Sequence, residues 1–446
     1  MRKQPQGINR RQFVRSAAAT AAAPLFVPST ALGDEQKPPP SERLNLGFIG
    51  VGMMNRGHLG HFLGQKDVQV LAVCDVDTTR RQAAKKTVED RYAERQKNGQ
   101  YKGCEAYNDF RDLIARRDID AVVIATPDHW HAIPCLEAIK AGKDIYCEKP
   151  LTLTIHEAKS LIDAVRKHDR VFQVGSQQRS EDKFRLACEL VRNGRVGKLQ
   201  KVYVKVGGPS KPCDLPEESL EPGLDWERWL GPAPLRPYNS VLSPRGIHNH
   251  FPNWRNYREY SGGMMTDWGA HHFDIAQRGL GMDTSGPVEI IPPADPKAER
   301  GVKYIYANGA LVIHGGTIPG LDPEKQKKVR GVTFVGTDGI VFVDRGYLAS
   351  DPDDLHKQPI GESEVHLYKS PGHQRDWLNC VRSRKRPLCD VEIGARSVTV
   401  CHLGNLAYWN HRKLKWDPAK WEFPGDAEAN QWRDRERRDP YQLPAV

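Results

Sequence analysis

The sequence predicts an α/β protein in which a doubly wound parallel sheet is followed by a second α/β domain with an open, mostly antiparallel sheet. Between residues 44 and 175, apolar strands alternate with helices, which is the pattern of parallel strands joined by crossover helices. The expected helices include residues 78–96 and 155–168. A glycine-rich turn follows the first of these strands. Beyond residue 175, several strands alternate apolar with polar residues between glycine-containing turns, which indicates antiparallel pairing. We expect these strands at residues 201–207, 302–306, 310–315, 329–336 and 339–343, and helices at 182–192, 269–280, 372–383 and 393–411.

Composition excludes some classes of function. The chain has 446 residues, enough for two domains, and its 39% hydrophobic and 27% charged residues are typical of a globular protein. Five of the ten net positive charges lie in residues 1–33, which contain no acid, and the other basic residues are mixed with acids. We therefore expect no nucleic-acid partner. The nine cysteines form no C-x-x-C pair, so they indicate buried thiols rather than a disulfide framework or a zinc site.

The N-terminus has the pattern of an export signal. Arg10-Arg11 precedes an alanine-rich apolar run, residues 16–27, and then the small residues Ser29-Thr30-Ala31. Residues 1–33 therefore predict a twin-arginine signal peptide and a periplasmic protein, with a disordered basic tail as the alternative. Residues 34–43 are a polar, proline-rich linker. No other stretch approaches the roughly 20 apolar residues of a membrane helix, so we expect no stable membrane insertion beyond the signal.

The glycine-rich turn after the strand at residues 44–49 predicts a dinucleotide site. Its residues are Gly50, Val51, Gly52, Met53, Met54, Asn55 and Arg56. Glycines let backbone N–H groups approach a pyrophosphate at the start of the next helix, although Asn55 stands where the G-x-G-x-x-G pattern has its third glycine. Asp75 ends the second strand, 23 residues after Gly52, where an acid would bind the adenosine ribose. This acid favours NAD, and nearby Arg80 keeps NADP as the alternative.

A βαβ unit at residues 120–153 brings further polar residues to the same crevice. A strand at 121–125 and another at 144–147 end in Thr126-Pro127 and Glu148-Lys149, respectively. Because ligands bind at the carboxyl ends of parallel strands, all four residues should face the cofactor. His131 lies in the turn after Pro127 and is a further candidate for contact with the nicotinamide half. The alternative for Lys149 is an ordinary strand end.

Asp267 and His271 are candidates for the chemistry. They stand four residues apart, so both could face one side of a helix with the carboxylate near the imidazole. Oxidation of a secondary alcohol needs a base for the hydroxyl proton, which suits His271, while Lys149 would donate to the same oxygen. Two alternatives stay open: His272 is the reactive histidine and His271 a core residue, or Asp267 merely caps the following helix.

Residues 245–260 are rich in histidine, asparagine, arginine and aromatic residues, a composition that suits a carbohydrate pocket. Trp254 and Arg255 from this segment, with Gln178 and His272, are the predicted substrate-binding residues. A surface loop is the alternative. His248, His250, His271 and His272 with Asp267 could also suggest a metal site, but their spacing fixes no ligand geometry, and we predict no metal.

Together these motifs resemble the glucose-fructose oxidoreductase and inositol dehydrogenase (Gfo/Idh/MocA) family. The motifs are Gly-Val-Gly at 50–52, Asp75, Ala-Thr-Pro at 125–127 with His131, Glu-Lys-Pro at 148–150, and the segment 261–274 with Asp267 and His271. The resemblance covers residues 44–416. It implies a Rossmann domain at 44–175 and a substrate domain at 176–425 that often forms an oligomer interface. Residues 426–446, beyond the resemblance, are charged and are predicted as a tail. It also implies Lys149, Asp267 and His271 as the catalytic residues.

We therefore expect an exported oxidoreductase that transfers a hydride between NAD(P) and a secondary hydroxyl of a sugar, polyol or glycoside, and that forms a homo-oligomer. Because exported enzymes meet little free cofactor, the first alternative is a glycoside hydrolase or lyase that retains NAD and works through a keto-sugar intermediate. The second alternative is a non-catalytic carbohydrate- or nucleotide-binding protein.

Overall fold

The computed structural model describes residues 42–328 and 331–446. The predicted signal peptide and residues 34–41 of the linker lie outside this range. Among the described residues, every helix is too short or too polar to span a bilayer.

The first domain contains a six-stranded parallel sheet. The strand order is β3-β2-β1-β4-β5-β6. The strands are β1 (Leu44–Ile49), β2 (Val68–Cys74), β3 (Glu105–Tyr107), β4 (Ala121–Ile124), β5 (Asp144–Cys147) and β6 (Phe172–Val174). Their apolar residues are buried because helices cover both faces of a parallel sheet. The order reverses between β1 and β4, so a crevice opens at the carboxyl ends of these two strands.

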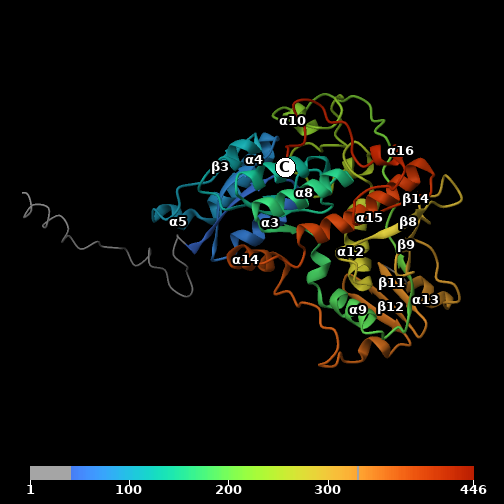
Figure 1. Cartoon of the computed structure of the whole chain (residues 1–446). Helices are drawn as coiled ribbons and strands as arrows, with labels where there is room; N and C mark the ends of the chain where they lie inside the picture. The colour runs from blue at the N-terminus through green and yellow to red at the C-terminus, as the bar shows by residue number, and fades with distance from the viewer. Residues whose placement is uncertain (1–41, 329–330) are drawn as a thin grey trace, which may run out of the picture.

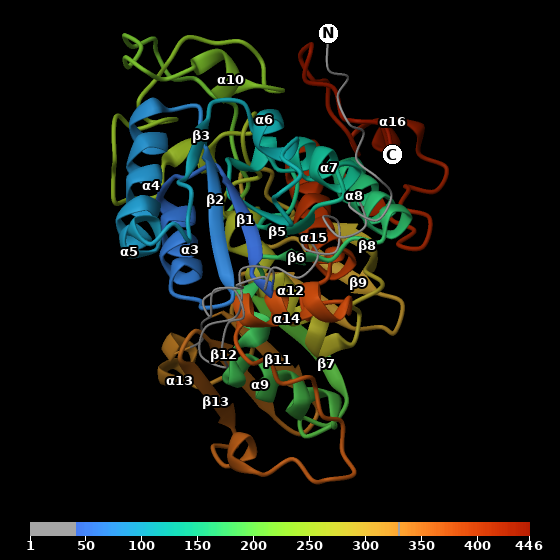
Figure 2. The ribbon, with the colours of Figure 1, turned by 90° about the vertical axis from the view of Figure 1, so that its left-hand side faces the viewer.

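Helices cover both faces of this sheet, with α3 and α4 on one side and α7 and α8 on the other (Figure 2). They are α3 (Met53–Leu63), α4 (Thr78–Arg91), α5 (Ala93–Lys97), α6 (Phe110–Ile114), α7 (Ala132–Lys140) and α8 (Ile155–His168). Local signals set several ends. Asp77 caps α4 through the N–H of Arg80, and Thr154 with Glu157 forms a capping box at α8. The helical region predicted at residues 78–96 is interrupted at Tyr92 and forms α4 and α5.

The second domain is built on an eight-stranded sheet with the order β13-β12-β11-β7-β10-β9-β8-β14. Only β7 and β10 pair in parallel. The strands are β7 (Leu199–Val204), β8 (Pro287–Ile291), β9 (Lys303–Tyr306), β10 (Leu311–His314), β11 (Val332–Gly336), β12 (Ile340–Asp344), β13 (Tyr347–Asp351) and β14 (Leu414–Lys415). The predicted fold class is therefore confirmed, although β8, β13 and β14 were not predicted.

Helices of the second domain lie between the two sheets and around them (Figures 1 and 2). They are α9 (Asp182–Arg192), α10 (Trp226–Leu230), α11 (Met264–Asp267), α12 (Gly269–Leu280), α13 (Pro323–Lys328), α14 (His373–Ser383), α15 (Val391–Asn410) and α16 (Ala427–Gln431). Short 3-10 turns occupy Asp128–Trp130, Gln177–Ser180, Asn253–Asn256 and Leu355–Lys357. Buried α12 packs against α9 and α15, and it carries His271.

A long segment between β7 and α11 lies on the first domain, where α10 stands above α4 and β3 (Figures 1 and 2). We call residues 209–260 the covering segment. It has a small core of its own, which includes Trp229, Tyr238 and Trp254. Backbone hydrogen bonds tie it to the loop after β2, from Thr78 N–H to Gly223 O at 2.9 Å and from Asp225 N–H to Val76 O at 3.0 Å.

The C-terminal residues 426–446, predicted as a charged tail, pack on the rest of the protein. Arg437 donates to the Glu157 carboxylate of α8 at 2.8 Å. The Tyr441 hydroxyl donates to Glu227 of the covering segment at 2.6 Å, and the Tyr441 side chain is buried. These contacts hold the C-terminal segment against both the first domain and the covering segment.

Candidate active site

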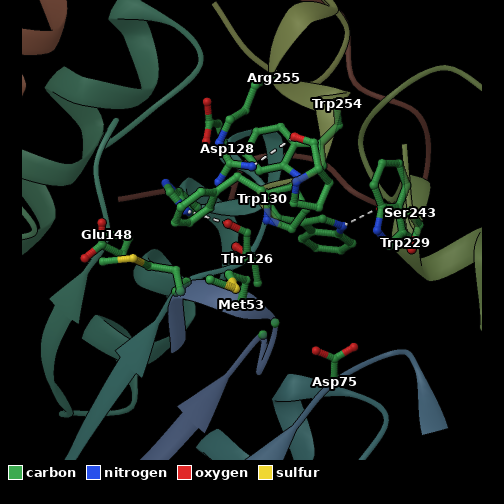
Figure 3. Close-up of a pocket in the computed structure, with 18 of the residues that line it drawn as sticks. Met53, Asp75, Thr126, Asp128, Trp130, Glu148, Trp229, Ser243, Trp254 and Arg255 are labelled. Atoms are coloured by element: carbon green, nitrogen blue, oxygen red, sulfur yellow. Dashed lines mark hydrogen bonds between the residues drawn. The ribbon is translucent and has the colours of Figure 1, made fainter. Parts of the chain in front are cut away.

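A cavity of about 500 Å³ lies at the carboxyl ends of β1 and β4. The first domain contributes the glycine loop, Asp75, Thr126, Pro127, Glu148 and Lys149 to its wall. The second domain contributes residues of α11 and α12, and the covering segment contributes Trp229 and residues 251–256. Figure 3 shows Asp75 and Met53 below, and Trp254 and Arg255 above, the same space.

The glycine loop fits a pyrophosphate at the N-terminus of α3. Gly50 has a φ of +74°, and a Cβ at this position would lie 2.8 Å from the Thr126 nitrogen. A Cβ on Gly52 would meet open space, and no side chain caps α3, so its first N–H groups are available to an anion. Met53 and Met54 line the cavity, whereas Arg56 does not and instead donates to the His248 carbonyl of the covering segment.

Asn55 explains the departure from the usual glycine spacing. It is fully buried, and its amide donates to the carbonyl oxygens of Gly50 at 2.9 Å, Ile49 at 3.2 Å and Val123 at 3.4 Å. The side chain thus ties the loop to the ends of β1 and β4. Asn55 supports the cofactor loop from behind and is not part of the cavity wall.

Asp75 and Arg80 mark the ribose end of the cavity. The Asp75 carboxylate accepts from the N–H groups of Val51 at 2.8 Å and Asp77 at 2.9 Å, and burial raises its pKa. Arg80 donates to Ser243 Oγ at 3.3 Å, to Gly246 O at 3.2 Å and to Pro244 O. Because its guanidinium is engaged by the covering segment, Arg80 is not free to bind an extra phosphate. These residues therefore fit NAD, which when bound would supply the hydride acceptor.

Lys149 and Asp267 form an ion pair at the catalytic end. Lys149 Nζ lies 2.7 Å from Asp267 Oδ1 and 3.1 Å from the Asp267 carbonyl oxygen. Arg255 Nε approaches the same carboxylate oxygen at 3.4 Å. Burial by itself would raise the pKa of Asp267, but the Lys149 and Arg255 charges outweigh burial and lower it. The carboxylate therefore stays ionised and holds the lysine ammonium at the cavity wall.

Two expectations about Asp267 are corrected. Its carboxylate binds Lys149 and Arg255, and it makes no hydrogen bond to His271 within the described residues. Asp267 is the last residue of α11, and the N-terminal cap of α12 is Trp268, with no side-chain capping bond. Asp267 therefore neither orients the imidazole nor caps the helix, because its carboxylate is bound by Lys149, which lies two residues after the end of β5.

His271 lines the cavity as a neutral imidazole. Burial, followed by the nearby charges of Lys149 and Arg345, lowers its pKa well below the ordinary value. Its Nδ1 is buried and has no partner within the described residues. A neutral imidazole at the cavity wall can accept a proton from a substrate hydroxyl. His272 lies outside the cavity wall, where it stacks on Trp268 with centroids 5.8 Å apart.

Glu148 and His131 line the cavity, but their polar atoms contact other groups of the protein. Glu148 Oε1 lies 2.8 Å from His58 Nε2 and accepts from the Tyr146 hydroxyl at 3.3 Å. A Cβ on Gly175 would approach Glu148 to 2.6 Å, so the glycine makes room for the carboxylate. The two ring nitrogens of His131 face the carbonyl oxygens of Pro150 at 2.8 Å and Thr126 at 2.9 Å. His131 thus bridges the turns after β4 and β5.

Among the predicted substrate residues, Trp254 and Arg255 line the cavity, whereas Gln178 and His272 do not. Neighbouring Gln177 does line it. Sequence reasoning missed several lining residues that come from distant segments. They are Trp229, Trp268, Arg345 and Tyr441. Only Trp268, beside Asp267, had a signal in the sequence; the others reach the cavity through tertiary packing.

The histidines considered for a metal site do not converge. His248 Nδ1 lies 2.8 Å from the His250 carbonyl oxygen. Within residues 42–328 and 331–446, no group of three or more histidine, cysteine, aspartate or glutamate side chains could hold a metal ion.

Curated relatives match part of the chain. A glycosyl hydrolase family 109 protein of Shewanella pealeana is 31% identical over 210 residues, 43% of this chain and 44% of that protein. Inositol 2-dehydrogenase of Salmonella typhimurium is 32% identical over 162 residues, 36% of this chain and 45% of that protein. The chain thus spans less than half of the length of these two relatives.

Solved structures share the fold over most of the chain. WlbA dehydrogenase from Bordetella pertussis, in complex with NADH and UDP-GlcNAcA, has a TM-score of 0.57 at 18% identity and covers 84% of this chain and 99% of that one. Aldose-aldose oxidoreductase from Caulobacter crescentus, complexed with glycerol, has a TM-score of 0.55 at 18% identity with the same two coverages, 84% and 99%.

Two family models account for nearly all of the described residues. Residues 44–176 match the NAD-binding Rossmann fold of the Gfo/Idh/MocA oxidoreductase family, and residues 162–443 match the C-terminal α/β domain of that family. The second match extends through Tyr441, so the C-terminal segment is part of the family domain. The cavity described above lies where these two domains meet, and the chain belongs to the Gfo/Idh/MocA family of NAD-binding oxidoreductases.

Proposed function

We propose that the protein is an NAD-dependent oxidoreductase that transfers a hydride between the nicotinamide and a secondary hydroxyl group of a sugar, polyol or glycoside. One observation carries this proposal: the Lys149–Asp267 pair and His271 line the same cavity as the glycine loop and Asp75. The residues suited to proton transfer and those suited to the cofactor therefore share one space.

The roles of the protein groups follow from their states. Lys149, fixed by Asp267 at 2.7 Å, donates a hydrogen bond to the reacting oxygen and stabilises negative charge on it. His271, kept neutral by its surroundings, takes the hydroxyl proton during oxidation and returns it during reduction. Trp254 and Trp268 add apolar surface to the cavity wall, which suits the C–H groups of a sugar ring.

The test begins with the protein purified without added nucleotide and then denatured to release what it carries. Near-stoichiometric NAD(H), followed by reduction of that NAD when sugars, polyols or glycosides are added, supports the proposal. The Lys149→Met variant should keep the nucleotide and lose the reduction. A protein that binds neither NAD nor NADP on titration overturns the proposal and leaves a binding protein.

A closed redox cycle is the second candidate, in which the substrate is oxidised, cleaved as a keto sugar and reduced again by the same cofactor. The covering segment favours it. Trp130 Nε1 donates to Trp229 O at 3.0 Å and Asn108 donates to Asp225 at 2.8 Å, so the segment is tied across the ribose end of the cavity. The similarity to glycosyl hydrolase family 109 proteins points the same way. Release of an aglycone without net NADH formation distinguishes this cycle from simple dehydrogenation.

We also propose that the chain is exported through the twin-arginine pathway and assembles as a homo-oligomer. The Arg10-Arg11 pair before an alanine-rich run supports the first point. Replacement of both arginines by lysine should keep a tagged protein out of the periplasmic fraction, while unchanged fractionation overturns export. Light scattering of the purified protein tests the oligomer, and a monomer at micromolar concentration overturns it.

A further inference from the structure

Charged groups are distributed unevenly along the cavity. At the ribose end, each arginine side chain lies beside a carboxylate or donates hydrogen bonds to carbonyl groups. Arg228 lies 2.9 Å from Asp225 and 3.6 Å from Asp109, Arg111 lies 3.4 Å from Asp109, and Arg80 is bound by the covering segment. At the catalytic end, by contrast, Lys149 and Arg255 share the single carboxylate of Asp267. Positive charge is therefore in excess beside the reacting centre.

The other acids near the catalytic end do not remove this excess. Glu148 is turned toward His58, Tyr146 and Gly175. Asp128 accepts from Ser261 Oγ at 2.6 Å, and the charges of His131 and Arg255 both act on its carboxylate. Burial by itself would lower the pKa of His131, but the Cys147 sulfur, Asp128 and the Pro150 carbonyl raise it to about 10. Both ring nitrogens of His131 face carbonyl oxygens, which fits the protonated ring. Three cations, Lys149, Arg255 and His131, therefore face only the two carboxylates of Asp267 and Asp128.

Arg255 is built to present a guanidinium to a ligand. Its guanidinium lies 4.1 Å from the ring centre of Trp254 and 5.2 Å from that of Phe251, so the aromatic side chains hold its plane. One terminal nitrogen donates to Pro252 O at 3.1 Å, and Nε faces Asp267. The side chain is only 15% exposed, and it lines the cavity. A fixed, partly buried guanidinium with remaining donors suits a carboxylate.

Arg345 adds a second positive charge from another element. It lies in the turn between β12 and β13, stacks on Trp268 at 4.6 Å and lines the same cavity. When the Gln178 amide is oriented so that its nitrogen donates to the His271 carbonyl oxygen, its own oxygen accepts a hydrogen bond from Arg345 Nε at 3.2 Å. Arg345 is in no ion pair within the described residues, so it too can face an anion. Trp268 between Arg345 and His271 is the apolar surface beside that position.

We propose that the substrate is a sugar or glycoside that carries a carboxylate, and that Arg255 binds this carboxylate while Arg345 contributes the second positive charge. The inference rests on the proposed oxidoreductase function, because it names the substrate class of the same site. The carboxylate neutralises the excess charge and leaves the hydroxyl group to Lys149 and His271.

The test compares matched sugars on the NAD-loaded protein. Glucuronate with glucose, and galacturonate with galactose, are titrated while tryptophan fluorescence reports binding, and reduction of bound NAD is followed separately. Glucose 6-phosphate is included as a different anion. The variant Arg255→Gln removes the charge, and Arg255→Lys restores a charge without the planar fork. Arg245→Gln is the matched control, because Arg245 belongs to the covering segment but stacks on Tyr238 away from the cavity wall.

The expected result is that at least one uronate binds tenfold or more tightly than its neutral partner. The Arg255→Gln substitution should weaken binding of the uronate at least ten times more than binding of the neutral sugar. The uronate affinity of Arg255→Lys should lie between those of the wild type and Arg255→Gln, and the affinity of Arg245→Gln should equal that of the wild type. Equal binding of both members of each pair overturns the inference, as does tighter binding of the sugar phosphate or an equal loss for both sugars in Arg255→Gln. Uronate binding without NAD reduction supports the inference while the proposed reaction fails.

Discussion

Replacing Asp267 by asparagine tests the ion pair on which the catalytic end depends. The substitution keeps the shape of the side chain and removes its charge, so Lys149 and Arg255 lose their shared anion. Oδ1 lies 2.7 Å from Lys149 Nζ and 3.4 Å from Arg255 Nε, and the Asp267 and Lys149 side chains are 11% and 15% exposed. At an effective dielectric constant of about 20, the shorter contact is worth about 6 kcal/mol before desolvation.

Desolvation of the two ions offsets much of this attraction. Removing one partner of a buried pair typically destabilises a protein by about 3–5 kcal/mol, and the residual exposure places Asp267→Asn near the lower value, about 3 kcal/mol. Urea unfolding of the nucleotide-free protein at pH 7, followed by tryptophan fluorescence, measures the difference. Asp214→Asn is the control, because Asp214 is 75% exposed and 3.7 Å from Lys211, so its loss should cost about 0.5 kcal/mol or less.

The pH dependence has a definite sign. The folded state lowers the pKa of Asp267 below 3.8, so the stabilisation is fully present above that unfolded value and is lost as the pH falls through the folded value. The difference between wild type and Asp267→Asn should be constant from pH 5 to pH 8 and should narrow below about pH 4. A variant within about 0.5 kcal/mol of wild type at pH 7, or a difference that grows on acidification, would refute the reasoning.

Three further changes test the site. Lys149→Met should lower kcat by about 10²–10³ while bound NAD stays stoichiometric, measured by turnover and nucleotide release; unchanged kcat contradicts the assigned role. Gly50→Ala should destabilise the fold by about 1–3 kcal/mol and weaken NAD binding, because Gly50 has a φ of +74° and the new Cβ would lie 2.8 Å from the Thr126 nitrogen. Calorimetry measures both effects, and an NAD affinity equal to that of the wild type contradicts the importance of this tight turn. Because the pKa of His271 is lowered, kcat should fall only below pH 6.5, as the base becomes protonated, and a fall centred above pH 7 contradicts a neutral His271.

Local signals in the sequence determined the elements of both domains. The helices predicted at residues 155–168, 182–192 and 269–280 have those bounds in the structure. Their ends depend on neighbouring residues, such as the Thr154 and Glu157 capping box and Gly281 in the left-handed conformation. By contrast, β8 and β14 were not predicted. β8 begins with Pro287 and β14 has only two residues, and these strands form only because β8 pairs with β14 and with β9.

The cofactor loop could also be predicted from the sequence by itself. The glycines and Asp75 are close along the chain, and the other cofactor residues directly follow parallel strands, whose carboxyl ends meet at one edge of the sheet. Which groups meet at the catalytic end was decided by the tertiary structure. The spacing of four residues suggested that Asp267 pairs with His271, but the carboxylate binds Lys149, which is 118 residues away. Ion pairs form with the charge that packing brings within reach, and neither Arg345 in a hairpin turn nor Tyr441 in the C-terminal segment could be placed in this cavity before the domains were packed together.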